Sequence, residues 1–234
     1  MASGSHILPT MIRLATLTVL ACVLFTGCAE PKSFLVKRPE DKQLDVAVTE
    51  MWSGEIANVA RDGDWILSRS YYAIADAITK IAPGEELSHA SIYDAKRGMI
   101  IEAVNAGVRE IPLADLVQRN HYMIIVRPRH QTAEEGTAAV ARARAAIGTP
   151  FDHMGFFGLQ DDNKFYCSEL AWWASQGEAR YGVHETIITP ANLMEYGEVV
   201  YWSGKRDDAQ VQSLAMERST EKHEMARRTA ALTR

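Results

Sequence analysis

Alternating apolar and polar positions divide the chain between residues 44 and 204 into a series of predicted helices and strands. The most regular signal is a β-hairpin, in which two apolar runs at residues 89–93 and 99–104 flank a polar turn. Further strands are expected over residues 65–67, 122–127 and 199–202, and helices over residues 44–61, 71–81, 132–147 and 167–176. Together these elements predict one globular domain with its own core.

The segments on either side of this domain are polar. Residues 29–43 contain Pro31 and Pro39 and predict a tether that precedes the domain. Residues 205–234 are charged, lack a strong apolar stripe and contain neither Gly nor Pro. This composition predicts a solvated helix or a partly disordered tail, to which we assign no function.

The first 28 residues have the pattern of a lipoprotein signal peptide. Arg13 precedes an apolar run over residues 14–25, which is shorter than the ~20 residues that span a bilayer. The small residues before Cys28 resemble the lipobox at which bacterial lipoproteins are cleaved, so Cys28 is the expected lipidation site. Secretion without a lipid is the alternative, and residues 1–10 are interpreted as an upstream start or a cloning remnant.

A lipid at Cys28, such as palmitate, would anchor the protein to a membrane without spanning it. Ala29 follows Cys28 in place of the Asp that, by resemblance to sorting in Gram-negative bacteria, retains lipoproteins at the inner membrane. The expected location is therefore the outer membrane, with the domain facing the periplasm.

Composition and charge exclude several classes of function. A net charge of −5 without a basic stripe disfavours nucleic acid as a partner and leaves small molecules, peptides and lipids. No glycine-rich phosphate loop is present, and we expect no cofactor. The sequence also predicts no metal site, because four histidines lie without metal-ligand spacing, at His121, His130, His153 and His184.

Cys167 is the one cysteine that remains after the first 28 residues, and it begins a predicted helix. A helix N-terminus stabilises a thiolate, and its free N–H groups can face a developing oxyanion. Because a thiol is mostly protonated at neutral pH, a hydrolase also needs a nearby histidine. A buried structural cysteine is the alternative interpretation.

The predicted hairpin supplies candidates for the partners of this thiol. If its turn centres between Ala95 and Lys96, Glu102 lies directly opposite His89, within reach of a hydrogen bond. A glutamate in the apolar run MIIEAV needs such a partner if it is buried. The alternative is an edge strand with Glu102 in water.

Six ordered segments carry a resemblance to a known family: DGDWILSR, LSHASIYD, MIIEAVNAGVREIPL, GTPFDHMG, FYCSELAWWA and ITPANLM. They resemble the YiiX/YaeF/YebB-like group of NlpC-type papain-like cysteine hydrolases, which are circularly permuted so that the histidine precedes the cysteine. The resemblance implies an α+β, permuted papain-like fold, with an antiparallel sheet packed against the helix that bears the nucleophile. It also implies Cys167 as nucleophile, His89 as general base and Glu102 as the orienting residue.

Four further residues are candidates for the surroundings of the site. Asp64 matches a family position, although a turn or capping role is the favoured interpretation. Phe151 is expected to pack near the site, and Tyr166 to line the pocket or fill the core. Glu169 does not share a helix face with Cys167 and is interpreted as structural.

The predicted function is hydrolysis of a peptide amide, most of all in cell-wall peptide, by a thiol peptidase or amidase. Its substrate partner would be a peptide or a peptidoglycan fragment. A lipid acyl hydrolase or acyltransferase of the same fold, a noncatalytic envelope-binding lipoprotein and a redox-sensing thiol are the alternatives.

Overall fold

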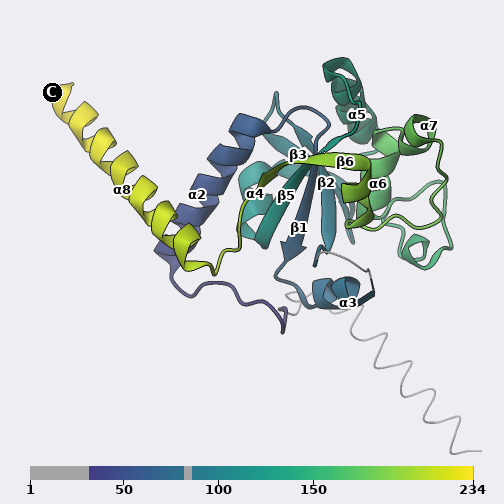
Figure 1. Cartoon of the computed structure of the whole chain (residues 1–234), viewed down its shortest axis with the longest axis horizontal. Coiled ribbons are helices and arrows are strands. Elements are labelled where there is room, and N and C mark those ends of the chain that lie inside the picture. Colours follow the sequence, from purple (N-terminus) through teal and green to yellow (C-terminus); the bar gives the residue numbers. More distant parts are fainter. Residues whose placement is uncertain (1–31, 82–85, 234) are drawn as a thin grey trace, which may run out of the picture. The chain divides into compact units, whose positions relative to one another are not determined.

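An antiparallel sheet of six strands, in the order β4-β3-β2-β1-β5-β6, forms the centre of the domain (Figure 1). The computed structural model describes residues 32–81 and 86–233, which belong to the compact unit Lys32–Arg234. The strands are β1 Trp65–Ser70, β2 His89–Asp94, β3 Met99–Val104, β4 Gly107–Pro112, β5 Asn120–Pro128 and β6 Gly197–Trp202.

Helices cover both faces of the sheet. One face packs against α5 (Ala133–Ala145) and α6 (Cys167–Ala174), and the other against α2 (Lys42–Val59) and α4 (Leu113–Gln118). Within the described residues, no helix has both the length and the apolar character needed to cross a membrane. The remaining helices are α3 Ala73–Ile81, α7 Gly177–Tyr181 and α8 Ala209–Leu232, with 3-10 turns at Gly155–Phe157 and Asn192–Tyr196.

The central strand β1 contributes to two separate cores. Successive side chains of a strand point to opposite faces, so Trp65 and Leu67 pack on the α6 side while Ile66 packs on the α2 side. The strand continues beyond its apolar first half. Arg69 can be buried in this second half because it forms an ion pair with Asp76 of α3. The sequence therefore predicted only the apolar half of this strand.

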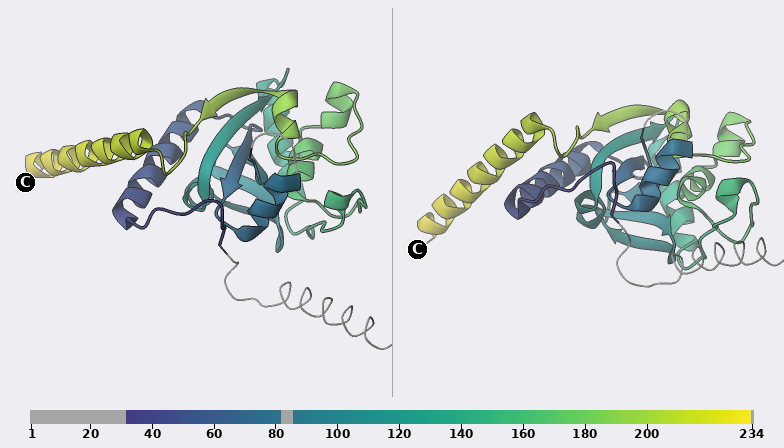
Figure 2. Two further views of the ribbon diagram at one scale, coloured as in Figure 1. Left: turned by 60° about the horizontal axis from the view of Figure 1, so that its bottom comes forward. Right: turned by 90° about the horizontal axis from the view of Figure 1, so that it is seen from below.

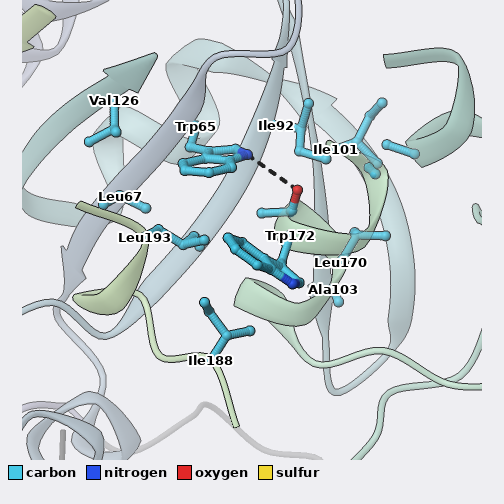
Figure 3. Packing of buried hydrophobic residues seen from close by; sticks show 14 of the residues in the cluster. Trp65, Leu67, Ile92, Ile101, Ala103, Val126, Leu170, Trp172, Ile188 and Leu193 are labelled. Atoms are coloured by element: carbon cyan, nitrogen blue, oxygen red, sulfur yellow. Dashed lines mark hydrogen bonds between the residues drawn. The ribbon is translucent and has the colours of Figure 1, made fainter. Parts of the chain in front are cut away.

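Trp65 ties the sheet to the helix that carries Cys167. Its indole Nε1 donates to the carbonyl oxygen of Ala171 at 3.2 Å, as drawn in Figure 3, and to Ser175 Oγ at 2.9 Å. The neighbouring Trp172 stacks on Tyr181 with ring centroids 5.5 Å apart. These contacts confirm the prediction of a sheet packed against the helix that begins at Cys167.

The short elements that escaped the sequence analysis include β4 and α4. β4 is an edge strand whose second half is only partly buried, so its apolar alternation is weak. α4 spans 6 residues and is too short to show a helical period. Both elements contribute residues to the site described below.

The polar segments that flank the domain are attached to it. Ser33 lies within the predicted tether, yet its N–H donates to Tyr71 O at 2.8 Å. At the other end, Arg206 lies beyond the predicted domain boundary at residue 204 and is fully buried. It donates to Val117 O at 2.6 Å and to Asp45 Oδ1 at 3.0 Å. The folded domain therefore continues past residue 204.

The tail beyond Arg206 is helical. It forms α8, which runs beside α2 and extends past it (Figure 2). Ala215 is its one buried residue among those described, and Arg218 and Lys222 pair with Glu55 and Glu50 of α2. Of the two predicted states, a solvated helix and a partly disordered tail, the structure has the helix.

Replacing Trp65 with Phe tests the link between sheet and helix. The substitution leaves the buried Ser175 hydroxyl without its donor, so we expect the free energy of unfolding to fall by about 2 kcal/mol. Urea denaturation measures this change. Trp202→Phe is the control, because that side chain is 61% exposed and should cost at most ~0.5 kcal/mol. Equal losses in the two variants would contradict the role of Trp65.

Candidate active site

Cys167 is the first residue of α6 and is 7% exposed. The preceding N–H, that of Tyr166, donates to Glu169 at 3.1 Å, which fixes the first turn of the helix. Ser168 donates to the carbonyl oxygen of Ile188 at 2.7 Å, and Ile188 donates back to the Tyr166 hydroxyl at 3.0 Å. The helix start is thus held from both sides of the cysteine.

His89 and Glu102 meet across the hairpin, although not in the predicted register. Ile92 pairs with Ile101, whereas the predicted register would place it opposite Met99. The prediction of direct pairing is therefore wrong by two residues. A shift of two keeps every side chain on the same face, so His89 Nε2 still donates to Glu102 Oε2, at 2.7 Å.

The first residues of β2 pair differently with the two neighbouring strands. The β1–β2 pairing extends back to His89, whereas the β2–β3 pairing covers Ile92–Asp94. Close to this start of β2, the His89 ring and the Ala90 N–H lie near the sulfur of Cys167, where both lower the pKa of the thiol. The nucleophile helix thus reaches the sheet where β2 and β3 are no longer paired.

Glu102 is fully buried and lies between three cationic groups. Arg109 faces it from β4 and donates to Oε1 at 2.9 Å, while Arg119, at the end of α4, donates to Oε2 together with His89. Sequence reasoning missed both arginines because it missed the elements that carry them. A predicted β4 would have placed Arg109 directly opposite Glu102.

Burial and hydrogen bonding act against each other on the pKa values of this cluster. For Glu102, burial raises the pKa, but the His89 hydrogen bond and the charges of His89, Arg119 and Arg109 prevail and lower it to about 2. For His89, burial lowers the pKa, but hydrogen bonds with Cys167 and Glu102 prevail and raise it to about 9. Glu102 is therefore ionised, and His89 is protonated at neutral pH.

The thiol shows the complementary shift. Burial raises the pKa of Cys167, but the hydrogen bond and charge of His89 and the Ala90 N–H outweigh it, so the pKa lies below the ordinary 9.0. Because Glu102 occupies Nε2 of His89, Nδ1 is the ring nitrogen left for the sulfur. The arrangement favours a thiolate–imidazolium pair, in which the sulfur can attack a carbonyl carbon and the ring can protonate a leaving group.

A helix-terminal thiol, hydrogen bonded to an imidazole that a carboxylate holds, is the arrangement of papain-like cysteine hydrolases. The histidine precedes the cysteine in this chain, the reverse of papain. A family model described as permuted papain-like amidase enzyme, YaeF/YiiX, C92 family, matches residues 59–222, and the chain belongs to this family. No curated protein matches the chain. The predicted permuted papain-like fold and the cysteine amidase or peptidase class are confirmed.

Asp64 does not join the site. It lies just before Trp65, which pairs with Ile92, whereas His89 pairs with Ser68 near the other end of β1. Its carboxylate is buried, and it accepts from the Arg61 N–H at 2.9 Å and from Arg127 at 2.8 Å. The turn role, rather than the pocket role, describes this residue.

Tyr166 directly precedes Cys167 in the sequence, and Phe151 is the second residue that was expected near the site. Tyr166 is fully buried, and burial raises the pKa of its hydroxyl, which accepts from Ile188. Phe151 is partly buried, with its ring centroid 4.9 Å from that of His153. It lines a cavity of about 640 Å³ formed by residues 151–154 and 159–164, of which Cys167 and His89 are not part.

Glu169 has the structural role predicted for it, since it accepts from the Tyr166 N–H. Burial is the main reason that its pKa is raised to about 7, and the nearby Asp152 and Asp162 add to the effect. Within residues 32–81 and 86–233, no group of three or more His, Cys, Asp or Glu residues is arranged to hold a metal ion.

The pKa of Glu102 predicts how stability depends on pH. Since about 2 lies below the ordinary 4.5, the ionised carboxylate stabilises the folded state fully above pH 4.5 and progressively less as pH falls toward 2. The shift corresponds to about 3 kcal/mol. Urea unfolding between pH 7 and 3 should show this loss in the wild type, and a lower, flatter profile in Glu102→Gln.

Glu217→Gln is the control for this measurement, because Glu217 is exposed on α8. It should keep the wild-type dependence on pH. A Glu102→Gln protein with the full wild-type acid loss would show that Glu102 is not the group responsible.

Proposed function

We propose that this family member cleaves a peptide amide, with cell-wall peptide as the leading substrate, through Cys167 as nucleophile, His89 as base and Glu102 as the orienting group. The observation that carries the proposal is the hydrogen bond that holds His89 on the buried Glu102 carboxylate, at 2.7 Å, together with the effect of His89 on Cys167, whose pKa it lowers. A cysteine with a purely structural role needs neither a histidine partner nor a carboxylate behind it.

The proposed reaction begins with attack of the Cys167 thiolate on the amide carbon. The backbone N–H groups at the start of α6 stabilise the oxyanion that forms, and His89 gives its proton to the departing amine. The acyl group stays on the sulfur as a thioester. His89 then takes a proton from water, which attacks the thioester and releases the acid, while Glu102 remains ionised throughout.

The proposed location follows from the first 28 residues, which lie outside the described part of the chain. With Cys28 acylated, the domain would face the periplasm from the outer membrane. Peptidoglycan stem peptides are amide substrates of that compartment, which is why we favour them.

A lipid acyl hydrolase or acyltransferase is the second candidate function. The loop that leads to Cys167 exposes Met154 at 51% and Leu159 at 63%, and Ile187 beside it at 37%. Gly158 of this loop lies next to Ile187, within van der Waals distance for an added Cβ atom. Exposed apolar side chains on the loop that precedes Cys167 in the sequence suit an acyl chain as well as a peptide.

The pH dependence of alkylation of Cys167 by iodoacetamide tests the thiolate–imidazolium pair. In the wild type, a rate plateau should extend well below pH 9.0, because His89 lowers the thiol pKa. In His89→Ala, burial still raises this pKa and only the Ala90 N–H and Ser168 oppose it, so the pKa should rise and alkylation at pH 7 should slow by at least about tenfold. Mass spectrometry of the modified peptide follows the reaction.

His184→Ala serves as the matched control, because His184 is exposed and pairs with Glu178 on α7. Its alkylation profile should match that of the wild type. Equal rates in the His89 variant and the wild type would sink the proposed pair and leave a structural cysteine.

Substrate assays separate the two candidate functions. Cys167→Ala should reduce turnover by at least about a thousandfold on the true substrate while the fold persists. Peptidoglycan fragments should yield new amino groups, and phospholipids should yield no fatty acid. Release of fatty acid without cleavage of peptides would assign the site to lipids instead, and turnover that survives in Cys167→Ala would exclude Cys167 as nucleophile.

A further inference from the structure

Three large apolar side chains are exposed where the described chain begins. Phe34 is 85% exposed, Leu35 57% and Ile74 65%. The first two precede α2, and Ile74 is on α3, but Lys32 bridges to Tyr72 and the Phe34 N–H donates to Asp76 of α3 at 2.8 Å. The segment therefore lies against α3, and we refer to Phe34, Leu35 and Ile74 as the α3 patch.

Hydrogen bonds hold the backbone of this patch in place. Ser33 Oγ donates to Asp76 at 2.6 Å, and the N–H groups of Leu35 and Val36 donate to Ser33 Oγ at 3.2 and 3.0 Å. Asp76 is itself paired with the buried Arg69. The ordered backbone thus keeps these apolar side chains exposed to solvent. Such exposure is unfavourable unless another surface covers them.

The charges around the α3 patch favour an anionic partner. Three lysines, Lys32, Lys37 and Lys80, are exposed within six residues of it along the chain, against two exposed acids in the described chain, Glu40 and Asp41. The nearest acid, Asp76, is buried, and Arg69 neutralises its charge. An apolar surface with lysines beside it has the character of a protein face that lies on a negatively charged bilayer.

The chain outside the structure indicates the same partner. Three residues separate Cys28 from Lys32, so their Cα atoms lie at most ~14 Å apart. We infer that the α3 patch docks on the surface of the lipid bilayer, with its apolar side chains in the headgroup region and the lysines at anionic lipids. This inference rests on the proposed acylation of Cys28 for its geometry, but the patch can be tested without the lipid.

The docked face includes the active-site end of the sheet. The Ser33 N–H donates to Tyr71 O, and Tyr71 directly follows β1, whose Ser68 pairs with His89. Figure 1 shows α3 just beyond the arrowhead of β1. With the α3 patch on the bilayer, the end of the sheet that carries His89 is also turned toward it. The enzyme would then take substrates close to the membrane surface rather than deep in the periplasm.

Flotation with vesicles of phosphatidylethanolamine and phosphatidylglycerol tests this docking. The protein is residues 29–234, which contain both described cores but not the lipidated cysteine. We expect it to float with the vesicles. The triple substitution Phe34→Ser, Leu35→Ser and Ile74→Ser should weaken binding by about tenfold or more, since each change removes a large apolar side chain from the contact.

The matched control replaces three exposed apolar residues on α2 and α8 with Ser: Val46, Met225 and Leu232, which are 50%, 63% and 87% exposed. This variant should bind vesicles like the parent protein. Absence of vesicle binding by the parent, or equal weakening in both triple variants, overturns the inference. A third outcome also overturns it: the parent protein is a dimer, the α3-patch substitutions alone dissociate this dimer, and vesicle binding persists. The patch would then join two copies of the chain.

Alkylation of Cys167 in the same proteins keeps this inference separate from the proposed function. The α3-patch variant should react with iodoacetamide at the parent rate, since none of its three residues contacts the site. Vesicle binding combined with an unactivated thiol would refute the proposed hydrolase alone. An activated thiol without vesicle binding would refute the docking alone.

Discussion

The buried carboxylate of Glu102 is the interaction on which the site depends. An ionised group without access to water must be matched by donors inside the protein, and here they come from three different elements: β2, β4 and the end of α4. None of these elements can separate from β3 without leaving a charge unpaired. The same constraint occupies one nitrogen of His89 and directs the other toward Cys167, so the stability of the sheet and the geometry of the imidazole share one cause.

The two halves of the site belong to different layers. His89 and Glu102 occupy strand positions of the same parity as Tyr93 and Ile100, which pack on the α2 side of the sheet. Cys167 begins a helix on the opposite side, which Trp65 and the contacts of Ser168 with Ile188 hold in position. The layers can meet at the start of β2 because its pairing with β3 covers only Ile92–Asp94. A uniform ladder of paired strands would leave the sulfur no approach to the Ala90 N–H.

The sequence was sufficient for the features that local patterns encode. The hairpin, the helix that begins at Cys167 and the match of a buried glutamate to a histidine all follow from periodicity and from the cost of burying charge. The exact register did not follow, because it depends on where the turn closes, and only the even size of the error kept His89 beside Glu102. Arg109 and Arg119 could not be predicted, since β4 and α4 are short and owe their form to tertiary pairing.

Arg206 shows how the domain tolerates an appendage. Its guanidinium lies 4.7 Å from the centroid of the Trp52 ring and donates to three carbonyl oxygens, the Thr49 hydroxyl and a carboxylate, so the chain is fastened immediately before α8 begins. The first turns of α8 are also held to α2, because Ala215 is buried and Arg218 and Lys222 pair with Glu55 and Glu50. Residues 223–233 are all exposed, so substitutions there can change the length and charge of the helix surface without disturbing either core of the domain.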